Sequence, residues 1–104
     1  MVIYVMKWDI RPEKAEAYQE WAKPAISRLL AAPGVAEFRA YRAATGCHEA
    51  VVTFEFADMQ AWASWHHNED VQKVNNERCA LTTNYNSELW GPSPIVPEPV
   101  RPGQ

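Results

Sequence analysis

The sequence has little of what marks several specialised protein classes. Only two of its 104 residues are cysteines, Cys47 and Cys79, and neither lies in a C-x-x-C pair or near histidines at zinc-finger spacing. We therefore expect free thiols and no metal site. The 10 lysines and arginines are outnumbered by 13 aspartates and glutamates, so nothing attracts nucleic acid or anionic lipid in general. The longest early apolar run, Val2 to Met6, is far shorter than the roughly 20 residues of a membrane span. A cytoplasmic protein without nucleic-acid or membrane partners is predicted.

Three common catalytic motifs are also missing from the chain. It has no Gly-rich phosphate loop, no G-x-S-x-G turn and no H-E-x-x-H helix. Phosphoryl transfer, serine hydrolysis and zinc proteolysis therefore lack support. The composition, 47% hydrophobic and 22% charged, is that of an ordinary globular protein, and the length suits a single domain.

Strand and helix patterns follow one another along the chain. Asp58 and Asn68 are suitable N-caps for two successive helices. Pro24 lies inside the first helical pattern, where it should kink the helix or divide it in two. The patterns predict strands at 2–8, 35–42, 48–56 and 83–90, a first helix from about Pro12 to Pro33-Gly34, a short helix after Asp58, and a further helix after Asn68 with Val71, Val74, Arg78 and Leu81 on one stripe.

This order of elements predicts the fold class. A chain of this length with the order βαββαβ is typical of an α+β, ferredoxin-like domain, an antiparallel sheet with helices on one face. We assign residues 1–90 to that domain. Residues 91–104 hold five of the eight prolines, so they are expected to form an extended tail rather than a central strand.

The third predicted strand has two different faces. Its even-numbered residues from Ala50 to Phe56 are apolar, whereas Glu49, Val51, Thr53 and Glu55 form a semi-polar face. This second face carries too much apolar surface to stay bare, so a homodimer through the sheet face is predicted. Opposite charges at positions 37, 39, 49 and 55 are expected to pair across the hairpin or in that interface.

A known family resembles this chain most clearly from the third strand onward. The third strand lacks the signature of RNA-recognition domains, K/R-G-F/Y-G/A-F-V-x-F/Y. The segment Phe54-Glu55-Phe56-Ala57-Asp58-Met59-Gln60-Ala61-Trp62, with the following Trp65-His66-His67-Asn68-Glu69-Asp70-Val71, resembles the antibiotic biosynthesis monooxygenase-like family of dimeric α/β barrels. The resemblance implies a ligand pocket between the helices and the sheet, a small aromatic substrate and no cofactor.

The chain departs from the family pattern at positions that matter for chemistry. Trp65 and Asp70 stand where the family segment usually has histidines. Haem-degrading members use an Asn, a Trp and an iron-binding His, whose counterparts here are Lys7 or Met6, Phe56 and Asn75. Haem degradation is therefore disfavoured.

The candidate site residues come from the predicted inner faces. His66 follows Trp62 by four residues on the same helical stripe and is the candidate catalytic base, because a histidine suits proton transfer near neutral pH. Tyr4, Trp62, Trp65 and Asn75 are the candidate substrate-binding residues, with the aromatic rings stacking a planar ligand. The alternative is that these aromatic residues are simply core and that His66 only stabilises a helix end.

Three functions remain open from the sequence. The first is a cofactor-independent monooxygenase acting on a quinol, a polyketide or another electron-rich aromatic compound. The second is an isomerase or cyclase that uses the same pocket for proton transfer without oxygen. The third is a non-catalytic binding or assembly protein in which the tryptophans are core.

Overall fold

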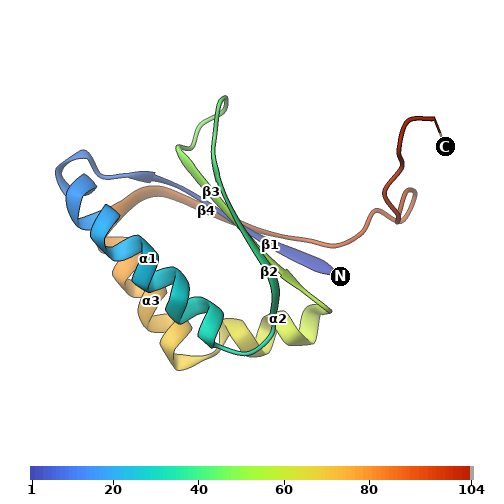
Figure 1. The fold of residues 1–104 in the computed structure, drawn as a ribbon, viewed down its shortest axis with the longest axis horizontal. Helices are drawn as coiled ribbons and strands as arrows, with labels where there is room; N and C mark the ends of the chain where they lie inside the picture. Colours follow the sequence, from blue (N-terminus) through green and yellow to red (C-terminus); the bar gives the residue numbers. More distant parts are fainter. Residues whose placement is uncertain (104) are drawn as a thin grey trace.

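Residues 1–103 are described by a computed structural model and fold into one sheet with a helical layer (Figure 1). The predicted strands and helices are all present, although the first strand runs to Ile10 instead of Trp8 and the third begins at Ala50 instead of His48. In chain order the elements are β1 (Val2–Ile10), the 3-10 turn η1 (Pro12–Lys14), α1 (Ala15–Ala31), β2 (Val35–Arg42), β3 (Ala50–Phe56), α2 (Met59–His66), α3 (Glu69–Leu81) and β4 (Thr82–Trp90).

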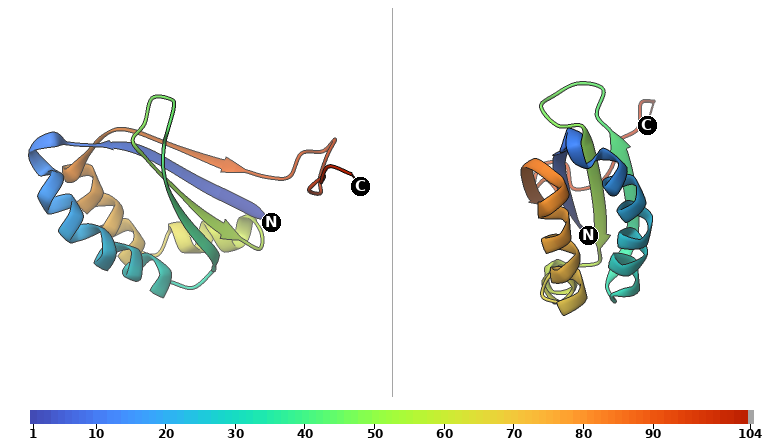
Figure 2. Two further views of the ribbon diagram at one scale, coloured as in Figure 1. Left: turned by 45° about the horizontal axis from the view of Figure 1, so that its top comes forward. Right: turned by 90° about the vertical axis from the view of Figure 1, so that its left-hand side faces the viewer.

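The four strands form one antiparallel sheet in the order β2-β3-β1-β4. Strand β1 is central: Tyr4 pairs with Phe54 on β3 and with Leu89 on β4. All three helices cover the same face of the sheet, and α1 lies beside α3 (Figure 2). The predicted α+β ferredoxin-like fold, with its βαββαβ order, is confirmed.

The alternation of side chains along β1 and β3 decides which face the helices cover. Apolar side chains at every second position point toward the helices and are buried, because successive residues of a strand face opposite ways. The inward set is Val2, Tyr4, Met6 and Trp8 on β1, with Val52, Phe54 and Phe56 on β3. The semi-polar face of β3 points away from the helices, toward the outer side of the sheet.

Helix α2 is held to the sheet by one large side chain. Trp65 is 1% exposed, and its ring lies 4.8 Å from that of Phe54 and 5.2 Å from that of Phe56, measured between centroids. Its indole N–H donates to the carbonyl oxygen of Leu29 at 3.0 Å, so the one polar atom of the ring is satisfied. This end of the helical layer is therefore densely packed.

Of the two outcomes predicted at Pro24, a kink or a division of the helix, the structure rules out the division. It is a single helix from Ala15 to Ala31 with Pro24 inside it. The neighbouring helix and sheet hold the segment helical although the proline cannot donate a backbone hydrogen bond. The chain then turns into β2 through Gly34, whose φ of 119° favours glycine; a Cβ there would lie 3.3 Å from the carbonyl oxygen of Ala61.

Both predicted N-caps are confirmed. The side chain of Asp58 accepts a hydrogen bond from the backbone N–H of Ala61 at 2.8 Å. Asn68 accepts from Asp70 N at 2.9 Å and from Val71 N at 3.3 Å. The caps satisfy N–H groups that have no partner inside a helix, and they fix where α2 and α3 begin.

Beyond Trp90 the chain carries no helix or strand up to residue 103. In Figure 1 this proline-rich tail runs away from the sheet and the helices. None of the helices in the described part of the chain is long and apolar enough to cross a membrane.

Candidate functional site

A cavity of about 220 Å³ lies between the sheet and helices α1 and α3, where the family resemblance predicts a ligand pocket. Helix α2 contributes no residue to its wall. The wall consists mostly of aromatic and aliphatic side chains: Met6, Trp8, Tyr18, Trp21, Ala22, Ala25, Ile26, Leu29, Phe38, Ala40, Tyr41, Ala50, Val52, Phe54, Val74, Asn75 and Arg78. A mostly apolar concave site with a few polar groups is typical of small-molecule binding.

The cavity exists because small side chains meet where large ones would fill the layer. Ala22 and Ala25 lie on α1, Ala40 on β2 and Ala50 on β3, and all four belong to the wall. At the α2 end the corresponding space is filled by Trp65. The hollow therefore reflects the alanines that take some of the inward positions on both layers.

Arg78 is the one charged residue in the cavity wall. Its side chain comes from the buried stripe of α3, and the residue is only 5% exposed. The guanidinium carbon lies 3.6 Å from the ring centre of Tyr85 and 5.6 Å from that of Trp8. Its Nη1 donates to Thr82 Oγ1 at 3.2 Å and its Nη2 contacts Cys79 Sγ at 3.7 Å, whereas its buried Nε has no hydrogen-bond partner in residues 1–103.

Two neutral polar side chains share the wall with Arg78. The Tyr18 hydroxyl accepts a hydrogen bond from the Trp8 indole N–H at 3.1 Å. Burial raises the pKa of Tyr18, although the hydrogen bond from Trp8 opposes this, so the phenol keeps its proton at neutral pH. Asn75 is half-buried, one helical turn before Arg78. The wall contains no aspartate, glutamate or histidine.

Three of the predicted site residues form an aromatic cluster outside the cavity wall. The His66 ring lies 5.1 Å from that of Trp62 and 5.8 Å from that of Tyr4, between centroids. Burial lowers the pKa of His66, and the neighbouring His67 lowers it further, so the ring is neutral at pH 7. Tyr4 OH lies 3.4 Å from Tyr85 OH. Tyr85 also stacks with the Arg78 guanidinium, so it connects this cluster to Arg78.

The structure thus separates the predicted site residues. Tyr4, Trp62, Trp65 and His66 lie together around α2, whereas Asn75 lies in the cavity wall. Trp65 belongs to the packed core, the alternative that the sequence left open for it.

Neither Tyr18 nor Arg78 is predicted as a functional residue from the sequence. Its only signal for Arg78 was a cation on a buried stripe between the apolar residues Val74 and Leu81.

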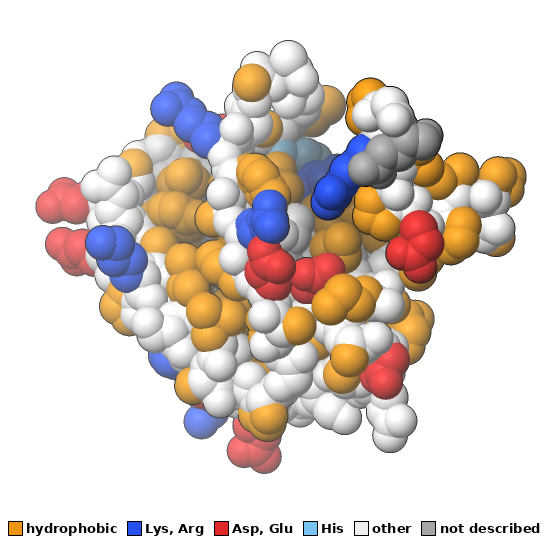
Figure 3. Space-filling view, turned by 45° about the vertical axis from the view of Figure 1, so that its right-hand side comes forward, with side chains coloured by type: hydrophobic (Ala, Val, Ile, Leu, Met, Phe, Trp, Pro, Cys, Tyr) orange, Lys and Arg blue, Asp and Glu red, His pale blue; other side chains and the backbone are white. Residues whose placement is uncertain are grey.

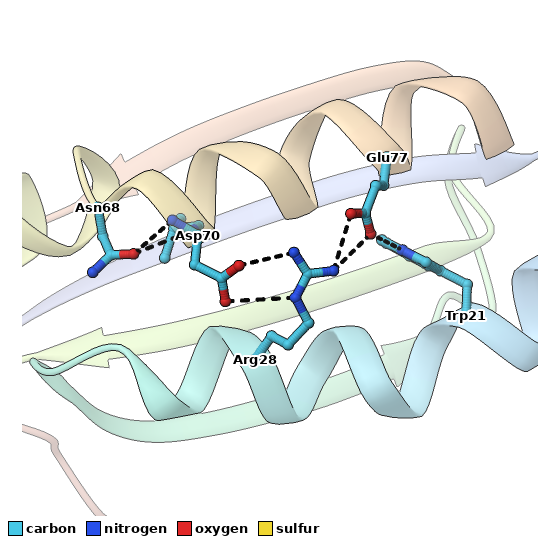
Figure 4. A network of polar contacts seen from close by, with 6 residues as sticks. Trp21, Arg28, Asn68, Asp70 and Glu77 are labelled. Atoms are coloured by element: carbon cyan, nitrogen blue, oxygen red, sulfur yellow. Dashed lines mark hydrogen bonds and ion pairs between the residues drawn. The ribbon is translucent and has the colours of Figure 1, made fainter.

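A polar bridge joins α1 to α3 on the outer side of the cavity (Figure 4). Arg28 on α1 donates to Asp70 at 2.9 Å and to Glu77 at 2.9 Å, both on α3. The Trp21 indole N–H donates to the same Glu77 carboxylate at 2.9 Å. Arg28 lowers the pKa of Asp70, and Trp21 and then Arg28 lower the pKa of Glu77. Trp21 also belongs to the cavity wall, so the bridge fixes part of that wall.

The outer face of the sheet is hollowed into an open groove of about 420 Å³. Its apolar floor includes Ile3, Val5 and Val51. The predicted charge pairing across the hairpin is not what the structure shows: Arg39 pairs with Glu37 of its own strand at 2.7 Å. Figure 3 shows a face of the molecule on which hydrophobic side chains surround a group of acidic and basic ones.

Metal ligands do not gather anywhere in residues 1–103. No group of three or more His, Cys, Asp or Glu side chains there is placed to hold a metal ion. Cys47 and Cys79 are both free and exposed.

A family model described as antibiotic biosynthesis monooxygenase matches residues 1–77. The chain belongs to this family. The match covers β1 through most of α3 and therefore includes nearly the whole cavity wall, although Arg78 lies one residue beyond it. No curated protein matches the sequence significantly.

Solved structures of low sequence identity share the fold of this family member. A ferredoxin-like dabb family protein from Mesorhizobium loti is 17% identical, with a TM-score of 0.78 over 88% of this chain and 96% of that one. A structure described as an antibiotic biosynthesis monooxygenase is 14% identical, with a TM-score of 0.74 over 90% and 100% of the two chains. SnoaB, a cofactor-independent oxygenase from Streptomyces nogalater, is 16% identical, with a TM-score of 0.72 over 93% and 97%.

Proposed function

We propose that the protein is a cofactor-independent monooxygenase that oxidises an electron-rich aromatic compound, such as a quinol, inside the cavity between α1, α3 and the sheet. The observation that carries the proposal is the cavity itself, with its mainly aromatic and aliphatic wall in a member of the antibiotic biosynthesis monooxygenase family. Such a wall excludes water and holds a flat ring by stacking.

The proposed reaction starts from a deprotonated phenol or enol. The anion transfers electrons to O2, and one oxygen atom enters the ring while the other leaves as water; a phenol thereby becomes a quinone. The protein has to bind the ring, favour its anion and exclude water from the reacting carbon. In this proposal Asn75, which belongs to the cavity wall, hydrogen-bonds an oxygen substituent of the substrate.

The base that removes the proton is a separate part of the proposal. His66 is neutral at pH 7 and suited to accept a proton, but it lies outside the cavity wall. It acts as base only on a substrate that reaches beyond the wall to the Tyr4 and Trp62 rings. His66→Ala tests this: a strong loss of turnover supports the base assignment, and unaltered turnover removes it without touching the cavity.

The experiment on the reaction itself is oxygen consumption with a panel of quinols and naphthols under 18O2. Consumption of one O2 per product, with one labelled atom in the product, supports the proposal. Conversion that continues under argon favours the isomerase or cyclase instead. Binding without conversion in either atmosphere contradicts both and favours a non-catalytic binding protein.

A homodimer through the outer sheet face belongs to the same proposal. The floor of that groove is partly apolar, with Ile3 and Val51 partly exposed, and a second copy is the partner that the sequence predicts. Sedimentation of the wild type as a dimer, and of Val51→Lys as a monomer, is the expected result. A monomeric wild type at micromolar concentration contradicts it.

A further inference from the structure

We propose that Arg78 forms an anion-binding site in the cavity, and that the ligand is an aromatic compound of one or two rings carrying a negatively charged oxygen. This inference rests on the proposed function and names its substrate class. The charged oxygen is that of a carboxylate or of an ionised hydroxyl group, and the chemistry that recognises the two is the same.

Arg78 is a buried cation without an anionic partner in the described residues. Arg78 is 5% exposed, and no ion pair joins it to a carboxylate in the described residues. A guanidinium keeps its charge in proteins, and a buried charge without a partner is strongly unfavourable. The rings of Trp8 and Tyr85 offset part of this cost through cation–π contact. They provide no negative charge, so an anion entering the cavity completes the site.

Arg78 and its neighbours in the wall keep hydrogen-bond donors that have no partner. A guanidinium has five N–H donors, and Arg78 has one partner at Nη1 and one at Nη2, so each of these nitrogens keeps a second hydrogen to donate. Its Nε–H is buried and has no partner in residues 1–103. The Tyr18 hydroxyl accepts from Trp8 and keeps its own hydrogen to donate. Trp8 thus contacts both groups, which places two donors at one end of the cavity. Asn75, three residues before Arg78 on α3, adds an amide on the same helical face.

The size of the cavity limits the size of the ligand. An engineered protein cavity of about 150 Å³ is enough to hold benzene. The present cavity of about 220 Å³ therefore suits one or two rings with a small substituent. Most of the remaining wall is apolar, with Phe38, Phe54 and Val52 from the sheet. A flat ring with a single anionic edge matches this division between an apolar and a cationic end.

The test measures equilibrium binding to the whole chain by isothermal titration calorimetry. The affinities of benzoate and 2-naphthoate are each compared with those of their uncharged amides. For the ionised hydroxyl group, the affinity of 4-nitrophenol is measured at one pH below and one pH above the pKa of its hydroxyl group. The carboxylates are expected to bind about tenfold or more tightly than the amides, because a charge-assisted hydrogen bond is lost in the amide. Arg78→Gln should remove this preference and leave amide binding nearly unchanged.

The control variant is Arg101→Gln, in the tail, which removes one arginine charge far from the cavity and should keep the preference. If Arg78→Gln does not fold, the wild-type ratio of carboxylate to amide affinity decides alone. Equal binding of acids and amides, or no binding of any of these compounds, overturns the inference. Because the readout is binding, carboxylate selectivity without oxygen consumption would contradict the proposed reaction and leave the anion site intact.

Discussion

The two ends of the helical layer are built differently. At the α2 end, Trp65 fills the space above Phe54 and Phe56, and its only polar atom is hydrogen-bonded. At the α1 and α3 end, Ala22 and Ala25 leave a cavity whose wall contains a buried arginine. The same sheet supports a filled core in one half and a hollow in the other.

This difference indicates which part of the molecule stabilises the fold and which part is available for function. Well-packed aromatic contacts stabilise a fold, whereas an unfilled apolar space and an unpaired buried charge both cost free energy. Features that lower stability persist where function requires them. The packed α2 end therefore stabilises the fold, and the proposed ligand site lies at the α1 and α3 end.

The largest expected effect is at the packed end. Trp65→Ala should lower the free energy of unfolding by about 3–5 kcal/mol, because it opens a cavity in a filled core. Trp21→Ala, in the half-exposed wall of the hollow end, should cost about 1 kcal/mol. Urea denaturation measures both. Equal losses for the two variants would remove the proposed difference between the ends.

Filling the cavity at the α1 and α3 end should raise the free energy of unfolding instead of lowering it. Ala25→Leu places a larger side chain in the cavity, so we expect a gain of about 0.5–2 kcal/mol in the free energy of unfolding and loss of ligand binding. The matched control is Ala17→Leu, an exposed position on the same helix, which should change neither property much. Unfolding curves and calorimetric titration with 2-naphthoate measure the two effects. Tight binding by Ala25→Leu would place the ligand elsewhere.

A smaller effect concerns pH and His66. Its pKa in the folded protein is lower than the ordinary 6.5, so the unfolded chain takes up the proton first as the pH falls. Stability should therefore decrease below about pH 6.5 until the folded state is protonated as well, and should not depend on this group above that range. His66→Gln should flatten the decrease, measured as the midpoint of urea unfolding from pH 7.5 to pH 4.5 (roughly the window set by the histidine pKa). An unchanged slope in His66→Gln would contradict the burial of His66.

The smallest effect is expected at the bridge between α1 and α3. Arg28→Gln removes both ion pairs, but all three partners are well exposed, so only a small fall in the melting temperature is expected, and salt should reduce it further. The depressed pKa values of Asp70 and Glu77 add stability above their ordinary range, and this is lost as the pH falls through the lowered values. The difference between wild type and variant should therefore shrink in acid. Thermal melts at two salt concentrations and two pH values measure this difference. A large fall in the melting temperature that does not depend on salt would contradict the small, screened contribution expected of exposed ion pairs.

Most of the fold could be predicted from local patterns. Alternation along β1 and β3 indicates their inner faces, and Asp58 and Asn68 indicate where the second and third helices begin, because each of these features acts over a few residues. The continuity of α1 through Pro24 could not be predicted this way, since it depends on what packs against the helix.

The candidate site was less predictable for a related reason. A cavity depends on the side-chain volumes of several helices and strands together, so it cannot be predicted from any single alanine. His66 and Trp62 were predicted as site residues because of their side-chain chemistry, but both lie outside the cavity wall. Arg78 was correctly expected on the buried stripe of its helix. That its Nε would have no partner depends on residues as distant in sequence as Trp8 and Tyr85.

The most direct test of this division of labour is a map of backbone amide NMR shifts as 2-naphthoate is added to the wild-type protein. The account predicts the largest shifts at cavity positions on α1 and α3, including Ala22, Ala25, Asn75 and Arg78, with little change around Trp65. Shifts centred on Trp62 and His66, or on the outer groove at Val51, would contradict it.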